Sequence, residues 1–164
     1  PEEYLTITED IVRAAKYSSL ITLGANGYVH ARVMQHFAPE ADLTLWFGAS
    51  PNSRKAEDIR RDNRVTAIFR EDSSPAYAVL AGHAEIVTDL DLRRSHWFPE
   101  WDAFFPGGPE GDDYALIKMT PTRIELLNFA RDVTPVPYGL AHRDLVLTNG
   151  VWQVVDGEPV KPAS

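Results

Sequence analysis

The stretch SPNSRKAEDIRRDNRVTAIF, residues 50–69, predicts a helix cap, a short helix and then a β-strand. Asn52 or Ser53 is the expected cap, because its side-chain oxygen can accept a hydrogen bond from an N–H group of the first turn. The helix then opens on two cations, Arg54 and Lys55, although a helix N-terminus already carries partial positive charge. Cations are unfavourable there unless an anion lies alongside, so this stretch predicts an anion site.

A third cation, Arg32, is expected near the same point. Alternation along the preceding strand, residues 28–37, places Arg32 on the face opposite Val29, Ala31 and Val33. First-turn N–H groups, a cap hydroxyl and three cations together suit a phosphate group.

The alternative is a plain protein surface. In that interpretation Arg54 and Lys55 are solvated cations that Glu57 and Asp58 balance, since most charged residues are exposed. The residues by themselves favour neither interpretation.

Around this stretch the chain is predicted to be mainly β. The expected strands are residues 19–25, 28–37, 43–47, 65–70, 77–88, 114–120, 123–129, 145–148 and 151–155. Asn26-Gly27 and Asn149-Gly150 predict tight hairpin turns, and short helices are expected at residues 9–16 with Thr8 as cap, 53–61 and 91–96. Frequent strands joined by hairpins predict a six-stranded antiparallel barrel. We expect residues 1–130 to form this domain and residues 131–164 to extend it with a β-hairpin and a loose tail.

Composition limits the partners. The chain has 164 residues, 44% hydrophobic and 24% charged, which fits one globular domain. Its net charge of −8 argues against broad electrostatic binding to nucleic acid or to anionic membranes, so any basic site must be local. The absence of cysteine excludes disulfides and thiolate sites. With no long apolar run and an acidic start, the protein is expected to be soluble and cytoplasmic.

No metal site is predicted, because the five histidines show no ligand spacing: His30, His36, His83, His96 and His142. The segment WFPEWDAFFPGGPEGDD, residues 97–113, is an aromatic loop of the kind that usually carries function.

An ordered set of motifs carries a family resemblance. The motifs are HARVM (30–34), LWFGA (45–49), SRKAEDI (53–59), NRVTAIF (63–69), VLAGHAEIV (79–87) and the aromatic segment with the strands after it. In this order they resemble the pyridoxamine 5′-phosphate oxidase-like FMN-binding split-barrel superfamily, and within it the general stress protein family. The resemblance covers roughly residues 5 to 128 and implies a six-stranded split barrel of the FMN-binding type.

The resemblance also implies a cofactor and its contacts. The missing anion would be the phosphate of FMN, with FAD as the alternative flavin. The residues expected to contact the cofactor are Arg32, Ser53, Arg54 and Lys55 at the phosphate, Val33, Met34, Trp46 and Phe47 along the ribityl chain and ring, and Tyr77 as a polar contact. Family members are homodimers with flavin sites at the subunit interface. The residues implied for that interface, or for a lid over the flavin, are Trp97, Trp101, Phe104 and Phe105.

The function implied is a flavin-dependent oxidoreductase acting on an unidentified small substrate or electron donor, and no catalytic side chain is assigned. Two alternatives stay open: a non-catalytic flavin-binding or buffering stress-response protein, and a split barrel that binds haem or a deazaflavin. The oxidases proper end with a basic segment that grips the substrate phosphate. This chain has no such segment, so pyridoxamine phosphate oxidase activity itself is not expected.

Overall fold

The computed structural model describes residues 1–73, 75–133 and 142–155. Its helices are α1 (Glu2–Ala14), α2 (Arg54–Arg61), α3 (Leu90–Ser95) and the 3₁₀ turn η1 (Pro99–Ala103). Its strands are β1 (Tyr17–Leu23), β2 (Val29–Gln35), β3 (Leu45–Ala49), β4 (Arg64–Glu71), β5 (Ala76–Val87), β6 (Ala115–Asn128), β7 (Arg143–Thr148) and β8 (Val151–Val155). The mainly β class predicted from the sequence is confirmed.

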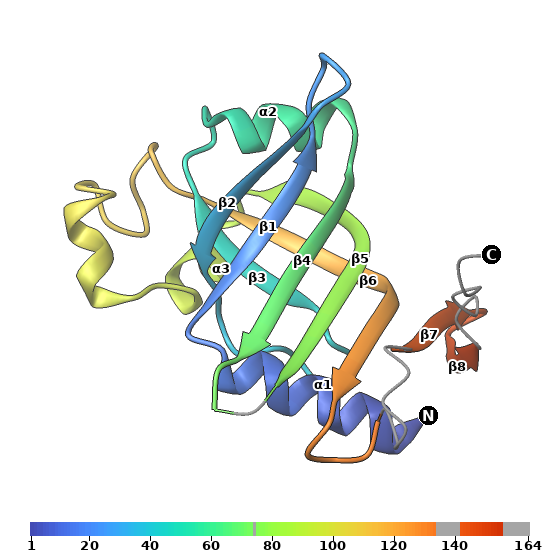
Figure 1. Cartoon of the computed structure of the whole chain (residues 1–164). Coiled ribbons are helices and arrows are strands. Elements are labelled where there is room, and N and C mark those ends of the chain that lie inside the picture. The colour runs from blue at the N-terminus through green and yellow to red at the C-terminus, as the bar shows by residue number, and fades with distance from the viewer. Residues whose placement is uncertain (74, 134–141, 156–164) are drawn as a thin grey trace.

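Strands β1 to β6 form an antiparallel barrel in the order β2-β1-β4-β5-β6-β3. An isolated bridge between His36 and Phe47 closes it, supported by a 3.1 Å hydrogen bond from the Phe37 N–H to the Trp46 carbonyl. Helix α2 covers one end of the barrel and α1 lies across the other (Figure 1). The six-stranded barrel is therefore confirmed, with β7 and β8 as additional strands.

Strand β6 corrects one expectation, because residues 114–120 and 123–129 were predicted as separate strands. They form one strand that runs through Pro121. The register against β5 shifts here, since Ala81 pairs with Arg123 and Gly82 with Pro121, which leaves Thr122 as an extra residue. Proline donates no ladder hydrogen bond and is tolerated at such a bulge, so it bends the strand without ending it.

The hairpin β7–β8 lies beside the barrel. β7 pairs with β6 over Arg123–Leu126, and β8 pairs with β7. Asn149 and Gly150 both have positive φ, 52° and 76°, as the predicted tight turn requires. The tail predicted to be loose lies outside the described residues from 156 onward.

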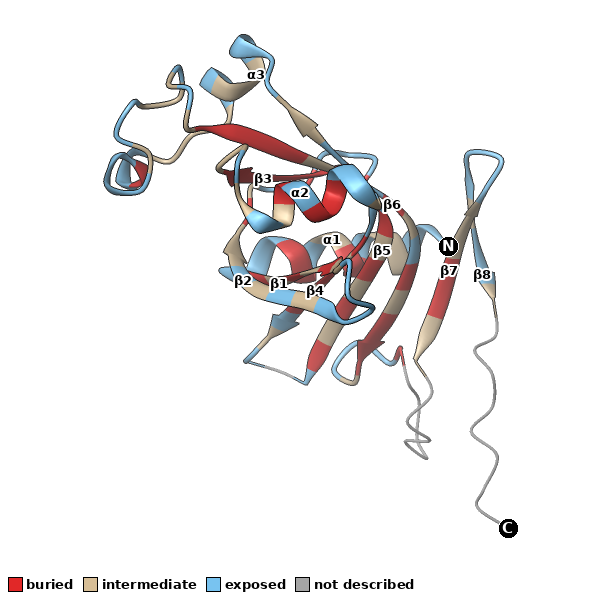
Figure 2. Ribbon diagram, turned by 90° about the horizontal axis from the view of Figure 1, so that it is seen from above, coloured by how far each residue is buried: buried red, intermediate tan, exposed pale blue. Residues whose placement is uncertain are grey.

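Helix α1 starts earlier than expected, at Glu2 rather than after Thr8. Thr8 is buried inside the helix, where its hydroxyl donates a 2.8 Å hydrogen bond to the Tyr4 carbonyl. The hydroxyl is thus satisfied one turn back rather than at a cap. Ile7, Ile11 and Val12 of α1 pack into the barrel core. The strands contribute the rest of this core, and Figure 2 shows buried residues alternating along them.

His36 joins α1 to the closure of the barrel. Its Nε2 lies 3.0 Å from the Val12 carbonyl, its Nδ1 lies 3.1 Å from the Ser18 hydroxyl, and its ring meets Phe69 edge-on at 4.8 Å. Burial lowers the pKa of His36, which favours a neutral imidazole. This histidine is a structural connection between helix and barrel.

Candidate functional site

The N-terminus of α2 forms as the sequence predicts. Ser53 is the cap: its Oγ accepts from the Ala56 N–H at 3.3 Å and donates to the Ser50 carbonyl at 2.7 Å. Arg54 and Lys55 therefore occupy the first turn, at the positive end of the helix.

Arg32, Arg54 and Lys55 are close enough to repel one another. Burial lowers the pKa of Arg32, and Arg54 lowers it further against the opposing effect of Asp58. Burial also lowers the pKa of Lys55, with Arg32 adding to the effect. No ion pair among the described residues involves Arg54 or Lys55. Arg54 and Lys55 share the first turn with Glu57 yet form no ion pair within the described residues, and Arg32 has only the Asp58 contact at 3.9 Å, so this group of cations supports the anion site over the plain surface.

Asp58 forms no ion pair with Arg54 or Lys55 among the described residues: it is a 2% exposed residue of α2 and approaches only Arg32 of the three cations, at 3.9 Å. It accepts hydrogen bonds from Thr22 Oγ1 at 2.8 Å and Arg61 at 3.0 Å, and its Oδ2 lies 2.7 Å from His30 Nδ1. Burial by itself raises the pKa of Asp58, but the hydrogen bonds of His30, Thr22 and Arg61 outweigh it and lower the pKa to about 2. Asp58 is a buried anion with its own donors.

The same network holds Arg32. Its guanidinium donates to Thr22 Oγ1 at 2.8 Å and to the carbonyls of His30 and Leu20 at 3.2 and 3.3 Å, and it lies 3.9 Å from Asp58. Thr22 thus links Asp58 to Arg32. Sequence reasoning missed Thr22 and Asp58 as positioning residues; the available signal was a polar threonine within the apolar strand 17–23.

A cavity of about 590 Å³ is lined by one of these cations, Lys55. Its lining comes from the start of β1, from β2, from the end of β3 and the segment that leads into α2, and from the aromatic loop: Lys16, Tyr17, Val33, Met34, Gln35, Gly48, Ala49, Ser50, Lys55, Glu100, Trp101, Phe104 and Phe105. The volume is in the range of small-molecule sites. The structure therefore brings Val33, Met34 and Lys55 together with three of the four predicted aromatic residues.

The aromatic loop packs closely on β3. A Cβ on Gly48 would lie only 2.2 Å from the Trp101 ring, so only glycine permits this approach. Trp101 is buried, and its indole N–H donates to Gln35 Oε1 at 3.0 Å. Phe104, by contrast, is 73% exposed at the cavity.

The comparisons with known proteins agree with this fold. A family model described as "Pyridoxamine 5'-phosphate oxidase like" matches residues 3–129. The chain belongs to this family. The curated Protein bli-3 of Neurospora crassa is 31% identical over 114 residues, which cover 63% of this chain and 54% of that protein. The chain thus matches about half the length of this relative.

Two solved structures show how far the family fold extends. A protein related to general stress protein 26, from Clostridium acetobutylicum, superposes with TM-score 0.70 at 18% identity and covers 95% of this chain and 96% of its own. A pyridoxamine 5'-phosphate oxidase-related, FMN binding protein from Nostoc punctiforme gives TM-score 0.66 at 16% identity, covering 96% and 95%. The family resemblance and the split-barrel fold are confirmed, and solved general stress protein 26 structures are among the structural neighbours.

Seven residues predicted to contact the family cofactor or to form its lid do not line this cavity: Arg32, Trp46, Phe47, Ser53, Arg54, Tyr77 and Trp97. Trp46 is buried and donates its indole N–H to Glu40 at 2.9 Å, and Phe47 is fully buried in the barrel core. Both residues thus lie in the protein interior, at 4% and 0% exposure. Trp97 packs against Trp101, 6.1 Å between ring centroids. Tyr77 lines a different cavity, where burial and the charges of nearby carboxylates raise its pKa.

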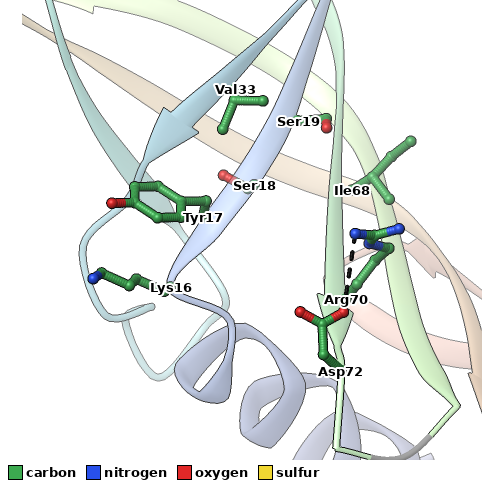
Figure 3. A pocket seen from close by; sticks show the side chains of 8 residues that line it. All are labelled: Lys16, Tyr17, Ser18, Ser19, Val33, Ile68, Arg70 and Asp72. Carbon is green, nitrogen blue, oxygen red and sulfur yellow. Dashed lines mark ion pairs between the residues drawn. The ribbon is translucent and has the colours of Figure 1, made fainter.

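A second cavity, of about 520 Å³, lies on the outer face of β1, β2 and β4. Figure 3 shows the ion pair between Arg70 and Asp72, 3.9 Å apart, on one side of it and Tyr17 and Val33 on the other. The two cavities share Lys16, Tyr17 and Val33, and the last two are 53% and 72% exposed. The site therefore opens onto a surface where polar residues surround the exposed side chains of Tyr17 and Val33.

No helix among the described residues is long and apolar enough to cross a membrane.

Asp58→Asn tests the positioning network. Loss of a buried charge that has three donors is expected to lower the free energy of unfolding by about 3–5 kcal/mol, measured by urea denaturation at pH 7. Because the folded pKa of about 2 lies below the ordinary 3.8, this stabilisation is complete above pH 3.8 and is lost as the pH falls through the folded pKa. Glu57→Gln, at an exposed position of the same helix, is the control. A loss within about 0.5 kcal/mol of the control would show that Asp58 does not hold α2.

Proposed function

We propose that the protein is an FMN-binding flavoprotein of the split-barrel type and a flavin-dependent oxidoreductase acting on a small substrate. The observation that carries this proposal is the group of three cations, Arg54 and Lys55 at the capped start of α2 and Arg32 on β2, of which Lys55 lines the 590 Å³ cavity. A phosphate there would meet opposite charge and the positive end of a helix dipole. Family membership and the FMN-binding neighbour support the same cofactor.

Different residues of the chain would bind different parts of the cofactor. Ser53, Arg54, Lys55 and Arg32 hold the phosphate, and the Thr22 contact keeps the Arg32 guanidinium in place before binding. Val33 and Met34 line the cavity on one side, and Trp101, Phe104 and Phe105 limit its access to water. When bound, FMN supplies hydride or electron transfer at its ring.

We also propose a homodimer in the cytoplasm, with the flavin sites at the subunit interface. The support is the apolar outer face of β1 and β2, where Tyr17, Val29 and Val33 are 53%, 59% and 72% exposed. A second chain on this face would cover the shared edge of the two cavities. In such a dimer Tyr77 would reach a flavin only across the interface.

Arg54→Ala tests the phosphate clamp. We expect FMN affinity to fall by about 1.5–3 kcal/mol, the range for a hydrogen bond to a charged group, in a flavin-fluorescence titration. Arg13→Ala is the control, because Arg13 is paired with Glu9 on α1 at 2.8 Å. Equal affinities of the two variants would refute the clamp.

Reduction of bound flavin by NADH or NADPH in stopped flow would favour the enzyme over the flavin-buffering alternative.

The dimer predicts a mass of about twice the 18.4 kDa of one chain in light scattering. Val29→Asp, which places a charge on the apolar face, is expected to shift the protein toward the monomer. Val151→Asp is the matched control, since Val151 is equally exposed at 60% but lies on β8. A monomer at micromolar concentration for the unmodified chain would contradict the proposal.

Pyridoxamine phosphate itself is not expected to be turned over, because the substrate would need a second phosphate site. Three of the remaining arginines serve elsewhere: Arg93 donates to the Gly111 carbonyl at 3.0 Å, and Arg94 and Arg123 pair with Glu110 and Asp144 at 2.6 Å. The measurement is pyridoxal phosphate formation by the flavin-loaded protein in air. Turnover of about 1 per second or more would show that a second phosphate site exists.

A further inference from the structure

A cluster of potential metal ligands lies away from the flavin site, where β7 joins β6. Glu125 on β6, Asp144 on β7 and His142 just before β7 each offer one ligand atom, and these atoms lie within 4.8 Å of one another. Glu125 and Asp144 are directly paired across the two strands. Like charges at such a position destabilise a sheet, so a cation is expected nearby.

Arg123 supplies only part of the compensating charge. It donates to Asp144 Oδ2 at 2.6 Å, while its distance to Glu125 Oε1 is 4.0 Å. The other oxygen, Asp144 Oδ1, is buried and has no hydrogen-bond partner in the part of the chain that the structure describes. A buried carboxylate oxygen without a partner is costly. This atom, on a side chain that is 4% exposed, therefore calls for a ligand.

The position of His142 explains what kind of ligand fits. Its Nε2 lies 2.9 Å from Asp144 Oδ1, yet the two atoms are not aligned for a hydrogen bond. Two ligand atoms this close without a hydrogen bond between them are compatible with binding to one cation. In a tetrahedral Zn²⁺ site with bonds of about 2.0–2.2 Å, neighbouring ligand atoms are about 3.3 Å apart.

We propose that Glu125, His142 and Asp144 bind a divalent transition-metal ion of the Zn²⁺ class. One imidazole nitrogen and two carboxylate oxygens suit such ions, whereas Mg²⁺ and Ca²⁺ prefer oxygen ligands alone. Glu125 and His142 are 40% and 34% exposed at their side chains, so they can turn the remaining distance toward the ion. Arg123 stays on Asp144 Oδ2 as an outer partner that orients the ligand.

The bound ion would connect the C-terminal hairpin to the barrel. β7 pairs with β6 over only four residues, Arg123–Leu126, and the family match ends at residue 129. Two of the three ligands therefore lie beyond the matched region. The sequence predicts no metal site here, since a ligand at position 125 and two at 142 and 144 form no recognisable spacing.

The test uses the full chain, without a histidine tag and freed of metal by a chelator. Isothermal titration calorimetry with ZnCl₂ is expected to show one site per chain, and MgCl₂ none. His142→Ala and Glu125→Gln should each weaken Zn²⁺ binding at least tenfold. His83→Ala is the control, because His83 is an exposed histidine on β5 outside the cluster. Zn²⁺ should raise the melting temperature of the unmodified chain and of His83→Ala, but not that of His142→Ala.

Three results would overturn the proposal: absence of Zn²⁺ binding, binding that both ligand variants leave unchanged, and equal weakening by His83→Ala. Asp144 is not varied, because it is buried and paired with Arg123. Glu125→Gln removes a charge on a half-exposed side chain, so this variant should fold, which circular dichroism can verify. Its Zn²⁺ titration then tests the site even if His142→Ala does not fold.

Discussion

The ionised carboxylate of Asp58 determines how the candidate site is assembled. A buried negative charge is stable only with donors around it, and here they come from three elements: Thr22 on β1, His30 on β2 and Arg61 on α2 itself. These contacts set α2 against the β1–β2 hairpin. The first turn of the helix then lies beside Arg32, which Thr22 holds from the strand side. The proposed phosphate site is therefore a consequence of a buried anion a few ångströms away.

The cavity depends on two hydrophobic cores rather than one. The larger fills the barrel beneath α1, and a smaller one gathers Trp46, Trp101, Tyr114 and Leu116. Gly48 lets the Trp101 ring approach β3 closely, so the aromatic loop is anchored at its centre while Phe104 stays exposed. The cavity between β2 and this loop is thus lined both by the buried, well-packed Trp101 and by the exposed ring of Phe104.

A chain of net charge −8 can still bind a phosphate because the relevant field is local. Charges separated by more than about 8–10 Å of solvent are largely screened at physiological salt. Burial and the nearby Arg32 both lower the pKa of Lys55, so the field at this point is positive although Glu57 lies in the same helical turn. Overall charge therefore excludes polyanionic surfaces as partners without excluding one small anion.

The sequence by itself determined the elements whose cause is local. Residue alternation defined the strands, Asn149-Gly150 defined a turn with positive φ, and Ser53 defined the start of α2, so the barrel class and the cation group were predictable. Tertiary structure decided that β6 continues through Pro121. The register shift against β5, with Thr122 as the extra residue of β6, accommodates a proline that donates no ladder hydrogen bond. Tertiary structure also directed the side chains of Trp46 and Phe47 into the two hydrophobic cores. In the same way it buried Asp58 against Thr22 and paired Asp144 with Glu125. These outcomes depend on residues that are distant in sequence, such as 22 and 58 or 125 and 144. No local pattern encodes which of them meet, because only the packing of α2 on the barrel and the register of β7 against β6 set those distances.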